Sequence, residues 1–392
     1  MINRWHKLIA WRGTRALAAL GACGAALGLW TVDVAAANKN GVSPNVVSLP
    51  SGPGSVRGMG ENFEPDLSTG TAKYEFEFAL PAGPGGVPVA PLRYDGGNGD
   101  GSIGLGWRFG TPFVRRKPGK PLPRYVDGPN QRDDDFDGEV DEIDELDRFV
   151  TELQKTPNTL VPGADGTYLG IKEGPFIRYV RVGGHWEANA PDGTRFVFGI
   201  SAAAREFDPE TGRVFRWFLE SETDVHGNET RYYYRRYDDE RNRNVPYLAR
   251  VEYGAGPAPW DNFHFVVFDY EPRPDFFENG RAGFIRRIGR RLKTVTVGTQ
   301  GPALAGHAAG DFNGDGTTDY LNHKYVLAYE AHPHWTLLTS ITEVGADNES
   351  ALPPLTFTYS LCAAERSFSA AGTERRPSSI LGSIGTPPHL FY

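Results

Sequence analysis

Carboxylates at alternating positions make residues 133–144 the stretch best suited to bind a cation. A glycine stands sixth in this stretch, where a calcium loop makes its sharpest turn. Ca²⁺ takes about six to eight hard oxygens from such a tightly wound chain, one of them a backbone carbonyl, here that of Glu139. The predicted ligands are Asp133, Asp135, Asp137, Glu139, Asp141 and Asp144.

Residues 311–322 repeat this spacing with a glycine at the same place. The last position falls on Asn322, a weaker ligand than a carboxylate. No amphipathic helices flank either loop, so the sequence predicts structural Ca²⁺ sites in turns of a β-rich protein rather than an EF-hand pair. The alternative is that each loop is a solvated acidic turn. The predicted ligands of the second loop are Asp311, Asn313, Asp315, Thr317 and Asp319.

No pattern of catalytic residues accompanies these loops. The sequence lacks a Gly-x-Ser-x-Gly elbow, a His-Glu-x-x-His pair and a P-loop. His226 stands beside a Gly-Asn turn with no nucleophile paired to it in sequence, and His332 and His334 lie in a proline-containing turn. The sequence therefore predicts a protein that is not an enzyme. A carboxylate or histidine pair with perturbed pKa values in a deep pocket would favour an enzyme instead.

The charge pattern argues against a nucleic-acid partner. A net charge of -8 gives the chain no general attraction to nucleic acid or to an anionic membrane. One basic cluster has few aromatic residues interleaved with it, so a solvated or acid-paired strand face is the better interpretation. This cluster comprises Arg286, Arg287, Arg290, Arg291 and Lys293.

Composition and periodicity predict that strands and turns position these residues. With 48 Gly and 30 Pro among 392 residues, the composition favours turns over long helices. Apolar residues alternate through residues 72–80, and turn pairs at 183–184 and 227–228 separate further short strands. We expect an all-β fold of many short antiparallel strands, in a sandwich or shell-like or partly propeller-like array, with few helices.

The N-terminus predicts export. In residues 1–37 basic residues precede an apolar stretch and small residues follow it, as in a signal peptide, and a polar linker then covers residues 38–56. Residues 20–23 resemble a lipoprotein cleavage box, although the apolar residues after Cys23 argue against lipidation. After signal removal only Cys362 remains, so an intramolecular disulfide is excluded. We expect a secreted protein without a stable membrane span.

Collinear motifs across residues 57–360 resemble the N-terminal domain of the SpvB family. That domain is shared with the B components of insecticidal toxin complexes and with relatives of the RHS/YD-repeat proteins. The loop at 311–319 stands where an insertion would lie, and residues 361–392 form an irregular tail without the long repeat region of full-length relatives, so the chain looks like a truncated or split member. The motifs are the Gly-rich opening at Gly58, the Gly-Leu-Gly-Trp run at 104–107, the hairpin at 217–234 with its Asp-x-x-Gly-Asn turn, and the Pro-Pro-strand at 353–359.

The resemblance implies a non-enzymatic virulence or toxin component. In toxin complexes the B component forms a β-sheet shell, completed by repeat-bearing chains, around a toxic effector. The chain is therefore expected to be an exported scaffold or assembly domain that packs against a repeat domain or partner chain to encase or deliver a toxin. The alternative is a secreted or surface binding module, stabilised by calcium, for carbohydrate or protein. Exposed Trp and Tyr clusters would favour the binding module, and an apolar strand edge would favour assembly.

Overall fold

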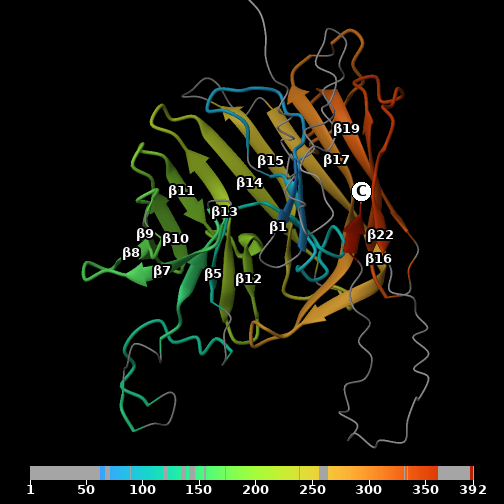
Figure 1. Cartoon of the computed structure of the whole chain (residues 1–392). Coiled ribbons are helices and arrows are strands. Elements are labelled where there is room, and N and C mark those ends of the chain that lie inside the picture. Colours follow the sequence, from blue (N-terminus) through green and yellow to red (C-terminus); the bar gives the residue numbers. More distant parts are fainter. Residues whose placement is uncertain are drawn as a thin grey trace, which may run out of the picture. The chain divides into compact units, whose positions relative to one another are not determined.

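Antiparallel strands make up nearly all of the regular structure that is described (Figure 1). Within the described ranges the one helical element is the 3₁₀ turn η1 (Ala202–Ala204), capped by Ser201, and no helix there is long and apolar enough to cross a membrane. The prediction of an all-β fold is confirmed. The computed structural model describes residues 62–66, 71–88, 90–117, 122–133, 138–140, 146–153, 156–172, 174–237, 239–255, 264–302, 304–330, 332, 334–360 and 389–391, all within one compact unit, Gly58–Tyr392.

Eight strands close into an antiparallel barrel, because each pairs with the next and the last returns to the first. Aromatic rings fill its interior. Phe149, Trp186 and Trp217 are all buried, with ring centroids 4.8 Å apart for Phe149–Trp186 and 6.2 Å for Trp186–Trp217. In ring order the strands are β5 (Phe113–Arg116), β6 (Phe149–Thr151), β7 (Asn158–Pro162), β8 (Thr167–Gly170), β9 (Arg178–Val182), β10 (His185–Asn189), β11 (Arg195–Phe198) and β13 (Val214–Thr223).

Strand β13 is shared between this barrel and a second, larger sheet (Figure 1). Its apolar residues alternate, so that Phe215, Trp217 and Leu219 are buried. One edge pairs with β5 near its start and with β14 near its end. The turn into β14 forms because Asp224 Oδ1 accepts hydrogen bonds from the His226 and Asn228 amides, at 2.8 and 2.9 Å.

The larger sheet continues from β13 in chain order. In addition, β12 pairs with the first residues of β13, and β18 pairs with β19. Its further members are β12 (Arg205–Phe207), β14 (Glu229–Arg236), β15 (Pro246–Ala255), β16 (His264–Asn279), β17 (Arg286–Gln300), β18 (Ala309–Gly310), β19 (Asp319–Glu330), β20 (Leu337–Val344) and β21 (Leu355–Thr356).

A four-stranded sheet packs on the larger one and completes the core. It comprises β1 (Asn62–Asp66), β2 (Thr71–Phe76), β3 (Leu92–Asp95) and β4 (Trp107–Phe109). The alternation predicted from residue 72 onward places Phe76 and Phe78 against the rings of Tyr325 and Phe268, at centroid distances of 5.6 and 6.3 Å. These contacts hold the two sheets together as the layers of a sandwich.

Several predictions about the two ends of the chain lie outside the described residues. They include the signal peptide at 1–37, the lipoprotein box at Cys23, the linker at 38–56 and Cys362. From the predicted irregular tail only His389–Phe391 are described, and they form β23, which pairs with β22 (Thr358–Ser360).

Candidate functional site

The second acidic loop closes the hairpin between β18 and β19. Strand β18 pairs with Asp319, the first residue of β19. Between them Gly314 and Gly316 take left-handed backbone conformations (φ +77° and +86°), which let the chain wind tightly. The Asp311 carboxylate accepts hydrogen bonds from the amides of both glycines, at 2.7 and 3.1 Å. The loop therefore winds around a carboxylate, as its spacing predicts.

The middle of the loop joins its oxygen-bearing side chains to each other and to β17. Asn313 Nδ2 donates to Asp315 Oδ2 at 2.9 Å, and the Asp315 amide donates to Asn313 Oδ1 at 2.9 Å. Thr317 Oγ1 donates to Asp315 Oδ1 at 2.5 Å, and Gln300 of β17 donates to Asp315 Oδ2 at 3.1 Å. Asn322, the weak last position, instead donates to Thr299 of β17. Its amide nitrogen thus binds the strand rather than the loop.

Asp319 differs from the rest of the loop because it has no solvent exposure. Its Oδ2 accepts hydrogen bonds from the Phe312 and Asn313 amides at 3.1 and 3.3 Å, whereas its buried Oδ1 has no hydrogen-bond partner. Burial, together with the charges of Asp315 and Asp311, raises the pKa of the Asp319 carboxyl. The spacing predicts Asp319 as a ligand, and only the fold shows that it is buried.

The first acidic loop is described only in part. Asp133 accepts a hydrogen bond from the Gly138 amide at 2.9 Å, and Glu139 is described, but Asp135, Asp137, Asp141 and Asp144 lie outside the described residues. Across the described part of the chain, no three His, Cys, Asp or Glu side chains are grouped so as to hold a metal ion. Calcium at either loop therefore stays a prediction, and at the second loop amide and backbone oxygens would have to complete the ligand set.

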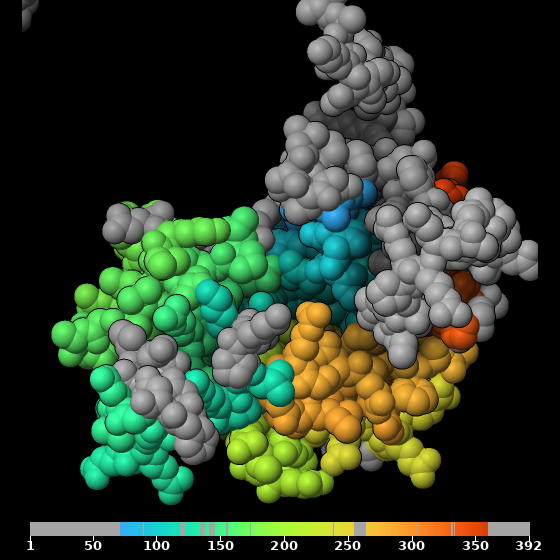
Figure 2. Space-filling view, turned by 60° about the horizontal axis from the view of Figure 1, so that its bottom comes forward, coloured from blue at the N-terminus to red at the C-terminus, as the bar shows by residue number. Residues whose placement is uncertain are grey.

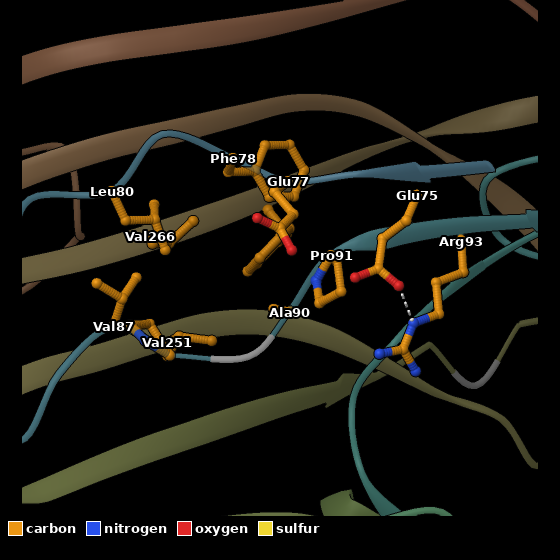
Figure 3. A pocket seen from close by; sticks show the side chains of 12 residues that line it. Glu75, Glu77, Phe78, Leu80, Val87, Ala90, Pro91, Arg93, Val251 and Val266 are labelled. Atoms are coloured by element: carbon orange, nitrogen blue, oxygen red, sulfur yellow. Dashed lines mark hydrogen bonds and ion pairs between the residues drawn. The ribbon is translucent and has the colours of Figure 1, made fainter. Parts of the chain in front are cut away.

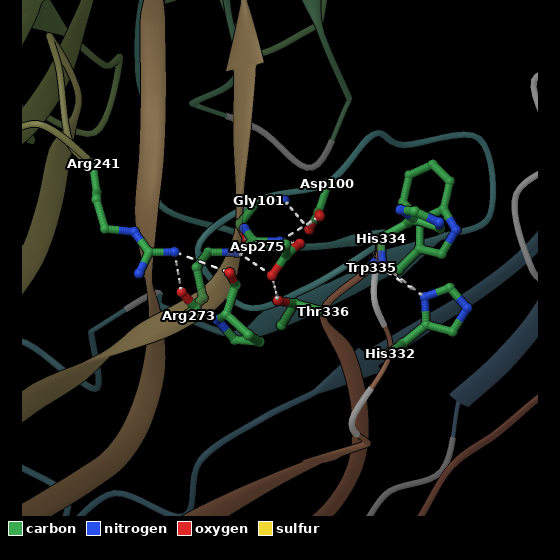
Figure 4. Close-up of polar contacts among 10 residues, drawn as sticks. Asp100, Gly101, Arg241, Arg273, Asp275, His332, His334, Trp335 and Thr336 are labelled. Atoms are coloured by element: carbon green, nitrogen blue, oxygen red, sulfur yellow. Dashed lines mark hydrogen bonds and ion pairs between the residues drawn. The ribbon is translucent and has the colours of Figure 1, made fainter.

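A buried ion network that sequence analysis missed fixes the glycine-rich loop between β3 and β4 (Figure 4). Arg273 of β16 is fully buried and pairs with Asp100 of that loop and, at 2.6 Å, with Asp275. Arg273 Nη1 also donates to the Gly101 carbonyl at 2.9 Å, and Thr336 Oγ1 donates to Asp275 at 2.7 Å. The one sequence signal was the Arg-Pro-Asp run at 273–275, whose partner Asp100 lies 173 residues away.

We expect Asp100→Asn to change how stability depends on pH. Burial outweighs the attraction of Arg273 and raises the pKa of Asp100 from 3.8 to about 6. Between these values the native chain holds a proton that the unfolded chain has released, so Asp100 stabilises the fold fully below about pH 4 and loses this contribution as the pH rises to about 6. The free energy of unfolding of the wild type should therefore fall, relative to the variant, by up to about 3 kcal/mol over this range.

Urea unfolding of both proteins at several pH values measures this difference. Asp165→Asn, in an exposed turn, is the control, and its difference from the wild type should not fall over the same pH range. Parallel curves for the wild type and Asp100→Asn would contradict the prediction.

The cavity beside this network shows no catalytic arrangement. It has a volume of about 650 Å³, and its described lining contains no His, Cys or Lys. Asp100 lines it, but both carboxylate oxygens are bound, by Arg273 and by the Gly101 amide. Glu206, also in the lining, lies between Arg216 and Arg286, at 3.4 and 2.6 Å. These carboxylates serve ion pairs, so the cavity does not favour the enzyme alternative.

A smaller cavity, of about 240 Å³, lies between the two sheets of the sandwich (Figure 3). Phe78, Leu80 and Val266 make its wall apolar, and the pair Glu75–Arg93, joined at 2.8 Å, stands at one side. Because the described lining holds no nucleophile and no histidine, we interpret this cavity as a packing gap between layers.

The remaining candidate residues have structural roles. His226 lies in the β13–β14 turn, and His332 Nδ1 accepts hydrogen bonds from the His334 and Trp335 amides within its own turn. The basic cluster lies on β17, which belongs to the part of the chain coloured orange in Figure 2, and each member pairs with a carboxylate. This confirms the prediction of an acid-paired strand face. The pairs are Arg286–Glu206, Arg287–Glu278, Arg290–Asp239, Arg291–Glu271 and Lys293–Glu271.

Apolar side chains are exposed together on the β7–β8 side of the barrel. We call them the β7–β8 patch; they border one groove of about 330 Å³. Asn158 hydrogen-bonds the Lys172 backbone at both its amide and its carbonyl, each at 3.0 Å, which fixes the chain that carries them. Phe176 has a left-handed backbone conformation (φ +49°), which is costly for a bulky residue. The patch comprises Val161, Leu169, Ile171 and Phe176, with exposed fractions of 45, 47, 64 and 69 %.

Comparisons with known proteins agree with this fold. The family described as Salmonella virulence plasmid 65kDa B protein, SpvB, matches residues 67–163 and 177–273. The crystal structure of TcdB2-TccC3 is similar with a TM-score of 0.63 and 24 % identity, over 81 % of this chain and 18 % of that chain. A Photorhabdus luminescens Tc holotoxin pore gives 0.61 and 24 %, over 81 % and 17 %.

The N-terminal domain of the effector protein SpvB from Salmonella typhimurium strain LT2 is also similar, with a TM-score of 0.52 and 21 % identity, over 66 % of this chain and 94 % of that domain. At such identities these structures establish the fold alone. This chain spans less than a fifth of the length of the two toxin-complex chains. No curated protein matches the sequence.

Proposed function

Because the chain belongs to the SpvB family, we propose that it is an exported, non-catalytic scaffold domain that packs against a further β-rich chain in a toxin assembly. One segment of a far larger chain in the TcdB2-TccC3 structure has a similar fold. The predicted signal peptide supports export. The partner we propose carries YD repeats, because the family resemblance pairs such chains with this domain.

The observation that carries the proposal is the β7–β8 patch. Ile171 and Phe176 are the most exposed of its residues, at 64 and 69 %, and burying such side chains against a partner is worth about 25 cal/mol per Å² of apolar area. The left-handed conformation of Phe176 costs stability. Both the exposed apolar side chains and the costly conformation of Phe176 are explained if a second protein covers the patch.

The alternative, a module that recognises ligands through aromatic rings, receives no such support. Every Trp and Tyr whose burial is described is at least partly buried, and Trp107, Trp186 and Trp217 lie in the core. Recognition by ring stacking needs accessible rings. The exposed apolar groups are instead mostly aliphatic, as at assembly interfaces.

We expect this chain to co-elute in size-exclusion chromatography with a YD-repeat chain encoded in the same genome when the two are co-expressed. The double variant Ile171→Asp, Phe176→Asp should bind that chain at least about tenfold more weakly, since it places two charges in an apolar interface. Val225→Asp, at a position that is 63 % exposed in the β13–β14 turn, is the control and should bind normally. Failure to bind any such chain, or equal binding by all three proteins, would refute the proposal.

A further inference from the structure

We propose that the loop at residues 311–319 binds one Ca²⁺ and that Asp319, whose Oδ1 is buried without a hydrogen-bond partner, is the ligand that decides affinity. This site lies outside the β7–β8 patch, and Ca²⁺ binding there does not depend on the scaffold role. Of the two acidic loops, only this one is described at each of its predicted ligands.

The unpartnered oxygen is the first reason. Buried polar atoms in native folds almost always have a partner, and a buried carboxylate oxygen without one is especially costly. Asp319 cannot turn toward solvent, because its Oδ2 is fixed by the Phe312 and Asn313 amides and its backbone by β18 on one side and β17 on the other. A cation bound at Oδ1 would remove the cost without moving the strand.

Uncompensated charge is the second reason. Asp311, Asp315 and Asp319 lie in nine residues of chain, and their charges act on one another. In the described part of the molecule no Lys, Arg or His forms an ion pair with any of the three. Arg250 Nη1 donates a hydrogen bond to the Asn313 carbonyl at 3.0 Å, but the Nε of the same side chain pairs with Glu252 at 2.9 Å. The loop thus has a net negative charge that a divalent cation would balance.

The chemistry of the donors selects the cation. The candidate donors are all hard oxygens, namely the side chains of Asp311, Asn313, Asp315 and Asp319 and the backbone carbonyl of Thr317. Because no three carboxylates of the described residues are grouped around one point, the amide and backbone oxygens must supply part of the set. Mixed carboxylate, amide and carbonyl oxygens suit Ca²⁺, whereas Mg²⁺ demands a stricter geometry and keeps more of its water. The bound ion would strengthen the link between the loop and β17, whose Gln300 already donates a hydrogen bond to Asp315.

Asp319→Asn is the decisive variant, tested in the full chain. After EDTA treatment, equilibrium dialysis against CaCl₂ should show that the variant binds one Ca²⁺ fewer per chain than the wild type, whatever the first loop contributes. Asp347→Asn is the matched control, because Asp347 also accepts two backbone amides in a tight turn but is exposed at the tip of another hairpin. It should bind as many ions as the wild type. Equal binding by Asp319→Asn, or no Ca²⁺ bound by the wild type at millimolar concentration, would overturn the proposal.

Thermal unfolding separates ion binding from a purely structural role. In EDTA, Asp319→Asn should melt at or above the wild-type temperature, because it removes a buried charge, and in millimolar Ca²⁺ it should melt below the wild type. The same difference in both buffers would overturn the proposal. If Asp319→Asn does not fold, Asp311→Asn and Asp315→Asn, both at exposed positions, are measured in the same way. Each should weaken Ca²⁺ binding at least tenfold. In the wild type, MgCl₂ should replace CaCl₂ poorly.

Discussion

Arg273→Met should lower the free energy of unfolding by about 3–5 kcal/mol at neutral pH. The guanidinium is fully buried and faces Asp100 and Asp275, so its loss leaves two carboxylates without their cation. Methionine fills similar space, which confines the effect to charge and hydrogen bonding. The loss should also release the β3–β4 loop, because Arg273 Nη1 holds the Gly101 carbonyl.

Urea unfolding followed by tryptophan fluorescence measures the loss. The control is Arg195→Met. Arg195 pairs with Glu187 at 2.8 Å, so the variant breaks an arginine–carboxylate pair of the same chemistry, but the Arg195 side chain is 54 % exposed. Such a surface pair is worth only about 0–1 kcal/mol. Equal losses from the two variants would show that burial does not govern the Arg273 network. If adding Asp100→Asn to Arg273→Met restored part of the lost free energy of unfolding, that part of the loss would be due to the Asp100 carboxylate that Arg273→Met leaves unpaired.

The local β-structure could be predicted from the sequence because its causes are local. Alternating apolar residues made β13, and the Asp-x-x-Gly-Asn turn made its hairpin with β14. The closure of the barrel could not be predicted, because β5 and β13 pair across about one hundred residues and no local pattern records which edges meet. The Arg273–Asp100 contact could not be predicted for the same reason, since neither residue by itself differs from an ordinary charged residue in the sequence.

The spacing of the second acidic loop predicts candidate ligands, whose binding of a metal stays a prediction, but it says nothing of how deeply each is buried. It identified Asp311, Asp315 and Asp319 as equivalent carboxylates, but β17 and β18 enclose Asp319 and leave the other two exposed. The terminal position was the weak point of the pattern, and in the structure Asn322 donates to Thr299. Burial depends on which strands flank a residue, which a loop motif cannot encode.

Trp107→Ala should also destabilise the chain by about 3–5 kcal/mol. The indole is 1 % exposed at the start of β4 and packs the four-stranded sheet against the segment that follows β21. Its ring lies 5.0 Å from Phe357 and 5.3 Å from Tyr94, and its Nε1 donates to the Tyr359 hydroxyl at 3.0 Å. The glycine-rich run before it permits this packing, because a side chain on Gly106 would meet the Tyr94 ring at 2.4 Å.

Two further variants show which part of Trp107 matters. Trp107→Phe keeps most of the apolar area but loses the hydrogen bond, so it should cost about 1–2 kcal/mol, well below alanine. Trp335→Ala, at a half-buried tryptophan in the β19–β20 turn, should cost less than Trp107→Ala because less buried area is lost. All three are measured by urea unfolding, with far-UV circular dichroism as the signal since each variant removes a fluorophore. A Trp107→Ala variant as stable as Trp335→Ala would mean that the layers are joined elsewhere, through Phe76, Phe78 and Tyr325.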